Sequence, residues 1–317
     1  MNFLSFSPNQ EPPGFDPRLL VSHQVDEHLS DESGKNHCSL WWSVVPGIPG
    51  ERPGVIGHFA ATSLEEALPL LAFALARLRA TGCTIALGPM DGNTWRRYRV
   101  LTERGEEPPF FMEPDNPDWW SDAFLLSGFS SLATYTSSLV DDLSRRDPRV
   151  ERARIRLEGE GIQIRNLDPD RFEDDLRRIY AVSVISFTGN FLYTPVPESA
   201  FIAQYLPYRD KIRPEFVYLA EDRGEPVGYL FAIPDYAEAQ RGLPMRTLIG
   251  KTLASVPGRR YGGLGVVLTD LLHQRAQSMG FSRVIHALQY EGNSVRNMSE
   301  FFGRVMRRYT LFSRRLT

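Results

Sequence analysis

Pro257-Gly258-Arg259-Arg260-Tyr261-Gly262-Gly263-Leu264-Gly265 is a glycine-rich stretch between two strongly patterned segments. The apolar run before it, residues 247–256, has the composition of a β-strand. After it, apolar side chains repeat at the spacing of one helix face until Gly280, a typical C-terminal stop (Leu264, Val267, Leu268, Leu271, Leu272 and Met279). A helix that follows such a turn directs unpaired N–H groups and its positive dipole end toward the turn. With Arg259 and Arg260 beside it, the stretch predicts an anion-binding loop.

Two other phosphate-binding motifs do not fit the same region. A dinucleotide-binding G-x-G-x-x-G motif needs a third glycine, which is absent at the required spacing. Gly250-Lys251-Thr252 resembles the end of a P-loop, but Met245 occupies the position of the first glycine. These three residues also lie within the predicted strand rather than before a helix. We therefore exclude both motifs.

The composition is that of a globular chain long enough for two hydrophobic cores. Of its 317 residues, 42% are apolar and 24% are charged, and the formal net charge is −3. This balance argues against a general nucleic-acid or membrane-surface binder. The two cysteines form no disulfide framework, the six histidines show no metal-binding spacing, and no signal peptide is recognisable. We therefore expect a cytoplasmic protein without a metal, a nucleic-acid partner or a membrane partner.

The sequence divides into two halves with a similar order of predicted elements. The polar, proline-rich residues 1–20 predict a poorly ordered start or an arm, and residues 1–37 are taken as an N-terminal arm or extension. Residues 38–140 form the first predicted domain, residues 141–154 a charged linker, and residues 155–317 the second domain. We expect the segments 133–138 and 309–315 to be the closing strands of the first and second halves. The pattern predicts a tandem repeat.

The first half lacks the anion-binding features of the second. The position that corresponds to the glycine-rich loop reads Ala61-Thr62-Ser63-Leu64-Glu65-Glu66, with no glycine and two carboxylates. Ser63 has the character of a helix N-cap. Because the carboxylates would repel an anion, we expect only the second half to keep a phosphate site.

The second half resembles the GNAT superfamily of acyl-CoA-dependent N-acyltransferases. The residues that carry the resemblance are Arg260-x-x-Gly263-x-Gly265 after the fourth strand, Asn293-Ser294 after the fifth, and a closing strand at residues 308–312. The resemblance implies an α/β fold with two GNAT-like domains, the first degenerate, each a mixed, mostly antiparallel sheet flanked by helices. For residues 38–140 it rests on strand order and on the Gly88-Pro89 turn.

The resemblance also implies a binding site for acetyl-CoA as a co-substrate. The amides of Gly263, Leu264 and Gly265 would hold the pyrophosphate, with Arg260 beside it, and Asn293 would contact the pantetheine arm. A backbone N–H near residues 254–256 would face the developing oxyanion. The predicted cofactor residues are Val256, Arg260, Tyr261, Gly262, Gly263, Leu264, Gly265, Asn293 and Ser294. One departure is Glu300, which stands where the family often has a tyrosine that protonates the leaving thiolate, so this resemblance assigns no acid.

Five further residues are candidates for catalysis or acceptor binding. His286, in a predicted strand, could take a proton from an amine, or it could be a hydrogen-bonded core histidine. Tyr309 could protonate the thiolate, or it could simply pack in its strand. Asn190 and Tyr193 could orient an amine, or belong to an aromatic loop that covers the core. Lys251 could line the acceptor cleft, or be solvated at a strand edge.

These observations support three hypotheses of different kinds. The first is an N-acyltransferase in which a primary amine of a small molecule or peptide attacks the acetyl-CoA thioester directly. The second is a non-catalytic acyl-CoA-binding sensor or scaffold, suggested by the missing helix tyrosine and the degenerate first half. The third is an aminoacyl transferase that uses charged tRNA, against which the acidic net charge argues. The acceptor, the acyl chain length and the oligomeric state, including a homodimer, stay open.

Overall fold

The predicted strand, turn and helix of the second half are present in the computed structural model, which describes residues 3–292 and 301–316. Strand β11 (Thr247–Ser255) leads through a short 3-10 turn, η4 (Arg259–Tyr261), into helix α8 (Leu264–Ser278). Gly263 is the N-cap of α8 and has a φ of 82°, which a glycine adopts without strain. The helical pattern is confirmed, because Leu264, Val267 and Leu268 are buried in the core beneath α8.

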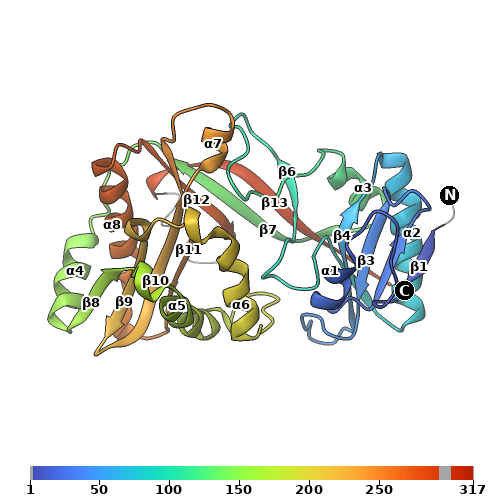
Figure 1. The fold of residues 1–317 in the computed structure, drawn as a ribbon, viewed down its shortest axis with the longest axis horizontal. Helices are drawn as coiled ribbons and strands as arrows, with labels where there is room; N and C mark the ends of the chain where they lie inside the picture. Colours follow the sequence, from blue (N-terminus) through green and yellow to red (C-terminus); the bar gives the residue numbers. More distant parts are fainter. Residues whose placement is uncertain (1–2, 293–300, 317) are drawn as a thin grey trace.

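The molecule consists of two lobes that share one 13-stranded sheet (Figure 1). The first lobe contributes, in spatial order, β1 (Leu4–Phe6), β2 (Glu27–Ser30), β3 (His37–Trp41), β4 (Pro53–Ala60) and β5 (Ile85–Gly88). The second contributes β8 (Ile162–Asn166), β9 (Val217–Asp222), β10 (Glu225–Pro234), β11 and β12 (Arg283–Tyr290). In each lobe the fourth and fifth of these strands are parallel and the others antiparallel. The predicted mixed α/β sheet is confirmed, and the repeated order is consistent with a tandem.

The closing strands of the two halves are exchanged between the lobes. Strand β7 (Ser130–Val140), from the first half of the chain, pairs with β12 of the second lobe. Strand β13 (Arg304–Arg315), from the end of the chain, pairs with β5 of the first lobe, with the short β6 (Val100–Glu103), and with β7. The two long strands cross the middle of the molecule together (Figure 1). The prediction that each strand closes its own half was therefore wrong, because strand pairing over this distance leaves no local signal.

Helices cover both faces of the sheet. In the second lobe, α4 (Val150–Gly159) and α8 lie on one face, and α5 (Phe172–Phe187) and α6 (Glu198–Tyr205) on the other. In the first lobe, α2 (Leu64–Ala80) and α3 (Trp120–Leu126) pack on one face, and α1 (Pro17–Ser22) on the other. Helix α7 (Tyr236–Gln240) and the 3-10 turns η1 (Pro169–Arg171), η2 (Leu206–Lys211) and η3 (Pro214–Phe216) complete the connections. Among the described residues, no helix has the length and apolar character of a membrane span.

Two segments that the sequence predicts to be an arm and a linker contain ordered elements. The predicted N-terminal arm contributes β1 and β2 to the sheet and α1 to its cover, so the expectation of a poorly ordered start was wrong for the described residues. This polar segment also contains a few apolar side chains that pack in the core, of which Leu20 and Leu29 are fully buried. The predicted linker, residues 141–154, runs into α4, whose Ala153 and Leu157 pack in the core of the second lobe. The domain boundaries themselves stay predictions.

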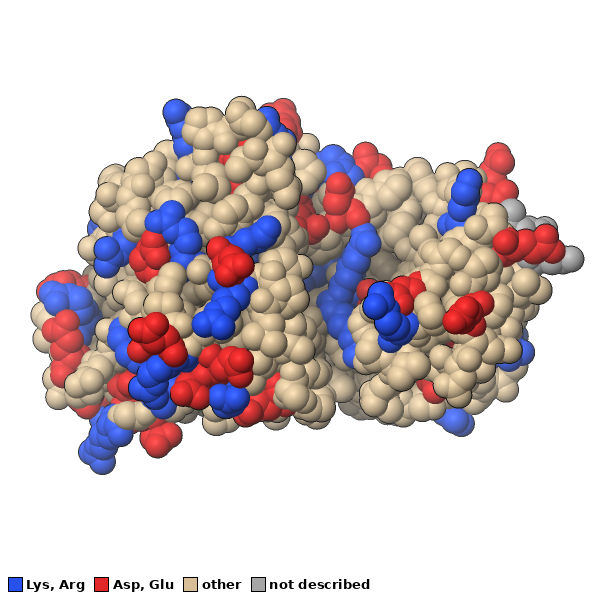
Figure 2. Space-filling model, viewed as in Figure 1, with Lys and Arg blue, Asp and Glu red and all other residues tan. Residues whose placement is uncertain are grey.

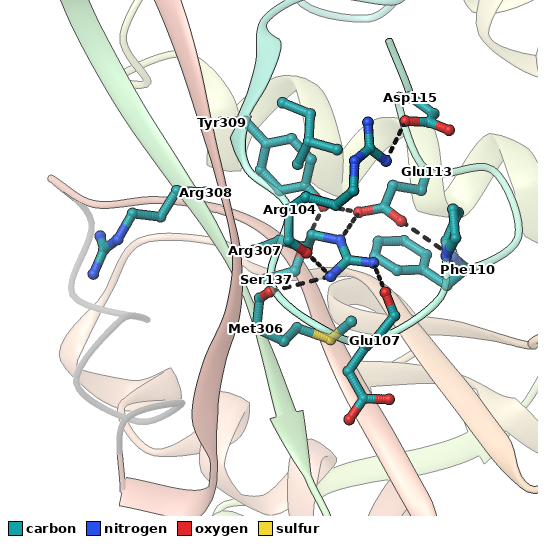
Figure 3. Close-up of polar contacts among 12 residues, drawn as sticks. Arg104, Glu107, Phe110, Glu113, Asp115, Ser137, Met306, Arg307, Arg308 and Tyr309 are labelled. Atoms are coloured by element: carbon teal, nitrogen blue, oxygen red, sulfur yellow. Dashed lines mark hydrogen bonds and ion pairs between the residues drawn. The ribbon is translucent and has the colours of Figure 1, made fainter. Parts of the chain in front are cut away.

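A buried ionic network holds a first-lobe loop against the exchanged strands (Figure 3). The side chains of Arg307 on β13 and Glu113 in the loop are 0% and 1% exposed, and Arg307 Nε lies 3.1 Å from Glu113 Oε1. Tyr309 donates its hydroxyl proton to the same carboxylate and lies 3.2 Å from Ser137 Oγ, which accepts the amide of Leu288 at 3.1 Å. The remaining N–H groups of Arg307 donate to backbone carbonyls (Arg104, Glu107 and Met306). The network thus joins the loop to β13, β7 and β12.

We predict that Arg307→Met destabilises the protein by about 3–5 kcal/mol, because it leaves the buried Glu113 carboxylate without its cation. The double variant Arg307→Met/Glu113→Leu, which removes both charges, should be less destabilised than the sum of the two single variants. Urea denaturation of the four proteins measures both effects. A stability of Arg307→Met within about 1 kcal/mol of the wild type would contradict this role of the network.

Four of the six histidines gather in the first lobe. His23 Nδ1 lies 2.8 Å from His58 Nε2, and Ser39 Oγ lies 2.9 Å from both His28 Nδ1 and His58 Nδ1. His37 Nδ1 donates to a backbone carbonyl nearby. Burial lowers the pKa of His23 to about 4 and those of His28 and His58 to about 3, and it also lowers the pKa of His37. The folded protein therefore holds this cluster neutral at pH 7.

We predict that the free energy of unfolding falls as the pH is lowered from about 6.5 toward 5. The folded-state pKa values of the cluster lie below the value of about 6.5 that an exposed histidine has, so the unfolded chain binds more protons in this window. Each such histidine contributes a slope of up to about 1.4 kcal/mol per pH unit. Urea denaturation between pH 7.5 and 5 should show a shallower slope for His58→Gln than for the wild type. Equal slopes for His58→Gln and the wild type would contradict the assignment of this pH dependence to the histidine cluster.

Candidate functional site

The fourth and fifth strands of the second lobe part in the middle of the sheet. β11 and β12 pair only from Thr247–Arg283 to Gly250–His286, although β11 continues to Ser255 and β12 to Tyr290. The register of β12 against β7 shifts just beyond His286, and Leu288 has a φ of +59° there. The unpaired halves of the two strands therefore border a gap.

This gap opens into a cavity of about 910 Å³. Segments of the second lobe form one wall, from β10, β11, β12, α8 and the loops around α6. Segments of the first lobe, residues 94–99 and 112–115, form the other. Figure 2 shows a hollow between the two lobes with basic side chains along it. The cavity is rich in aromatic residues (Trp95, Tyr98, Tyr135, Phe187, Phe191, Tyr193, Tyr205, Tyr208, Tyr229 and Tyr290).

The N-terminus of α8 lies beyond the end of β11 and carries no side-chain cap. The first intrahelical bond runs from the Val267 amide to the Gly263 carbonyl at 3.1 Å, which leaves the preceding amides of the first turn without helical partners. Both glycines permit close packing here. A Cβ on Gly263 would lie 2.9 Å from Ala153 Cβ on α4, and one on Gly265 would lie 3.4 Å from Leu253 on β11. The arrangement has the features of an anion site.

The side chains around this loop are fixed by partners other than a ligand. Arg260 Nε lies 2.8 Å from Asp222 Oδ2, and the Tyr261 hydroxyl donates to the same carboxylate at 3.1 Å. Arg156 on α4 donates to loop carbonyls, including those of Arg260 at 2.9 Å and of Gly262. These contacts shape the loop, and they turn the Arg260 charge toward Asp222.

The amide of Val256 is also engaged, because it donates to the Val227 carbonyl on β10 at 2.9 Å. Hydrogen-bonding direction alternates along a strand, so the amides of Leu253 and Ser255 point to the opposite side of β11, toward the gap. Of the predicted residues 254–256, only Ser255 therefore directs its amide toward the gap.

The corresponding gap in the first lobe is closed by the chain itself. Met90 donates its amide to the Ile56 carbonyl on β4 at 2.8 Å, and Asp91 Oδ1 accepts the His58 amide at 2.6 Å. A Cβ on Gly57 would collide with the Met90 carbonyl. Ser63 caps α2 through the Glu66 amide at 3.3 Å. The polar groups that a ligand would use in this lobe are thus already satisfied.

The structure brings most of the predicted acceptor and catalytic residues to one place. His286, Lys251, Asn190 and Tyr193 all line the cavity. His286 Nε2 lies 3.1 Å from His273 Nε2 on α8, and burial lowers the pKa of His286 to about 4, so its imidazole is neutral at pH 7. Burial, followed by the positive charge of Arg99, lowers the pKa of Lys251 to about 8.

Tyr309 and two predicted cofactor residues are not at the cavity wall that is described. Burial raises the pKa of the Tyr309 hydroxyl well above its usual value, and the hydrogen bond to Glu113 raises it further. Its role as an acid stays a prediction. Asn293 and Ser294 lie outside the described residues. In the described part of the chain, no group of three or more His, Cys, Asp or Glu residues could hold a metal ion.

The first-lobe wall of the cavity was missed by sequence reasoning. Trp95, Arg99 and Glu113 line the cavity, but none of them is among the predicted site residues. The only local signal was an unusual density of aromatic and basic residues at positions 95–99. Their position at the cavity depends on the exchanged strands, which bring the two lobes together.

Comparisons with known proteins agree with this topology. No family model matches the chain. A protein of Caulobacter vibrioides (strain NA1000 / CB15N) described as a bacterial ceramide synthase is 22% identical over 191 residues, which are 58% of this chain and 49% of that protein. The match thus spans about half the length of that relative.

Three solved structures are similar over nearly the whole chain. A GCN5-related N-acetyltransferase from Sphaerobacter thermophilus has a TM-score of 0.52 at 11% identity, with 99% of this chain and 96% of that chain covered. One from Anabaena variabilis has a TM-score of 0.53 at 8% identity and covers 100% and 73%. A GCN5-related glucosamine N-acetyltransferase region of a fungal multi-domain β-N-acetylglucosaminidase has a TM-score of 0.54 at 12% identity and covers 99% and 38%. The chain therefore has the fold of the GCN5-related N-acetyltransferases, with the same strand order repeated in its two lobes.

Proposed function

We propose that the protein is an N-acyltransferase that moves an acyl group from acyl-CoA to a primary amine. The observation that carries the proposal is a path of three successive features: the uncapped N-terminus of α8, the edge of β11 that β12 leaves unpaired, and the cavity between the lobes. A phosphate-bearing thioester with an extended arm matches this path. The relative described as a ceramide synthase adds support, because ceramide is an amide of a fatty acid.

We propose a place along this path for each part of acyl-CoA. The amides of Gly263, Leu264 and Gly265 would bind the pyrophosphate at the positive end of α8. The pantetheine arm would lie along β11 and use the gap-facing amides that β12 leaves unpaired. The thioester would then reach the point where the strands part, beside Gly250 and His286.

In the reaction, the amine nitrogen attacks the thioester carbon, and the carbon–sulfur bond breaks as the amide forms. Positioning supplies much of the rate, because the cavity brings the amine to the carbonyl. The amide of Leu253, which points to the gap, would stabilise the oxyanion. The amine must be uncharged to attack, and it becomes strongly acidic once bonded to the carbonyl carbon.

His286 is the residue that we propose to move the proton. Its neutral imidazole lines the cavity where the strands part, and it is hydrogen-bonded to His273 behind it. A base of low pKa is sufficient, because the tetrahedral intermediate carries an acidic ammonium group. The imidazolium would then return the proton to the departing sulfur, so that one residue serves as base and acid.

The test is CoA thiol release from acetyl-CoA and a long-chain acyl-CoA in the presence of a panel of primary amines. We expect amine-dependent release by the wild type and a decrease in kcat of about 10²–10⁴-fold in His286→Gln, with little change in CoA affinity. Saturable CoA binding without release from any amine would contradict the transferase and favour a sensor.

A matched pair of variants tests the CoA site within the same experiment. Gly265→Asp places a negative charge in the first turn of α8, where it stabilises the helix but repels a pyrophosphate. Gly265→Asn has nearly the same shape without the charge. Calorimetry should show CoA affinity weakened about tenfold or more in the aspartate variant relative to the asparagine variant. Equal affinities would exclude the α8 N-terminus as the pyrophosphate site.

A further inference from the structure

Two cationic side chains face the cavity from opposite lobes. Arg99 precedes β6 in the first lobe, and Lys251 follows Gly250, the last residue of β11 that pairs with β12. The two charges are close enough that Arg99 contributes to the lowered pKa of Lys251. Like charges repel, so their proximity in a partly buried cavity needs a compensating interaction.

Arg99 is held rigidly in place. It is 8% exposed, and its guanidinium carbon lies 3.9 Å from the ring centre of Tyr98 and 4.2 Å from that of Tyr135. Its backbone has a φ of +73°, unusual for a side chain of this size, and its amide donates to the Pro89 carbonyl at 2.8 Å. Such local strain is found where a side chain must point in one direction.

The hydrogen-bonding capacity of Arg99 is largely unused. Nη1 donates to the Leu288 carbonyl at 3.3 Å, whereas Nε is buried and has no hydrogen-bond partner among the described residues. Lys251 Nζ has a long contact of 3.5 Å to the Met112 carbonyl. Within residues 3–292 and 301–316, neither cation forms an ion pair with a carboxylate. Glu113, which lies near Lys251, is occupied by Arg307 and Tyr309.

Arg99 differs from the buried Arg307 in the partners of its guanidinium group. Buried charges in proteins are normally paired, because an unpaired one loses its hydration without compensation. Arg307, which is also buried, has a carboxylate and three carbonyls as partners. Arg99 has two aromatic rings and one carbonyl, which stabilise the cation but leave it able to accept an anion. The electrostatics of the cavity therefore favour the binding of a negatively charged group.

We propose that Arg99 and Lys251 together bind an anionic group, a carboxylate or a phosphate, on the amine acceptor. The inference rests on the proposed function, which places the amine beside Gly250 and His286. An acceptor that enters the cavity would then present its amine to the thioester and its anionic group to the two cations. The substrate class is that of amino acids and phosphorylated amines, and it excludes simple uncharged amines.

The assignment gives the first lobe a part in the reaction of the second. The gap in the first lobe is closed by residues 90–91, yet Arg99 follows in the same segment and reaches the cavity. The degenerate copy would thus select the acceptor, and the second copy would bind the acyl donor.

The experiment compares amines in matched pairs that differ in one charge: glycine with glycinamide, β-alanine with β-alaninamide, and O-phosphoethanolamine with ethanolamine. Binding to the CoA-saturated protein is measured by calorimetry, and thiol release from acetyl-CoA is measured in parallel. We expect at least one anionic member to bind about tenfold or more tightly than its neutral partner. The carboxylate and phosphate arms identify which anion is preferred.

Two variants and two controls assign the preference to these side chains. Arg99→Gln, which keeps a planar group between the tyrosines, and Lys251→Gln should each reduce the discrimination to about twofold or less. Arg79→Gln and Lys35→Gln, at exposed positions outside the cavity, should retain it. Circular dichroism and thermal melting establish that each variant is folded. If Arg99→Gln does not fold, the anion preference is tested with Lys251→Gln alone.

The outcomes separate this inference from the proposed function. Preferential binding of an anionic amine that depends on Arg99 or Lys251, without thiol release from any pair, would support the anion site and contradict the transferase. Thiol release with equal use of charged and neutral members would support the transferase and overturn the anion site. Absence of binding by every anionic probe would also overturn it.

Discussion

The end of hydrogen bonding between β11 and β12 at the Gly250–His286 pair is the constraint on which the site depends. Backbone N–H and C=O groups inside a sheet need partners, so a gap between strands must be filled by protein, water or a ligand. In the first lobe the equivalent gap is filled by Met90 and Asp91. In the second lobe the gap leads from the α8 N-terminus to a cavity. The same architecture thus yields one closed copy and one open copy.

The exchange of closing strands makes the two copies a single unit. Because β7 pairs with β12 and β13 pairs with β5, neither lobe completes its sheet without the other. The exchange also brings the loop around Glu113 (Figure 3) to the open copy. The segment around Arg99 reaches the same cavity. We expect no cofactor site in the first lobe, which forms one wall of the cavity and contributes Arg99 to it.

The parts of this account that follow local sequence patterns could be predicted. The strand, turn and helix around Gly263 were visible because glycine positions and helical periodicity are set by neighbours in the chain. The positions of His286 and Lys251 at the cavity followed from that placement. The strand exchange and the role of Arg99 could not be predicted, because they depend on contacts between residues more than a hundred positions apart. The expectation of a poorly ordered start failed because buried side chains such as Leu20 outweigh a polar composition. The boundaries of the predicted linker stay predictions.

A structure of the protein with bound CoA tests the central claim most directly. The account predicts the pyrophosphate on the amides of Gly263 to Gly265 and the pantetheine arm beside residues 251–255, with its thiol at the level of His286. It also predicts that Met90 and Asp91 keep the gap of the first lobe closed. CoA bound in the first lobe, or bound to the second lobe away from the β11–β12 gap, would contradict the account.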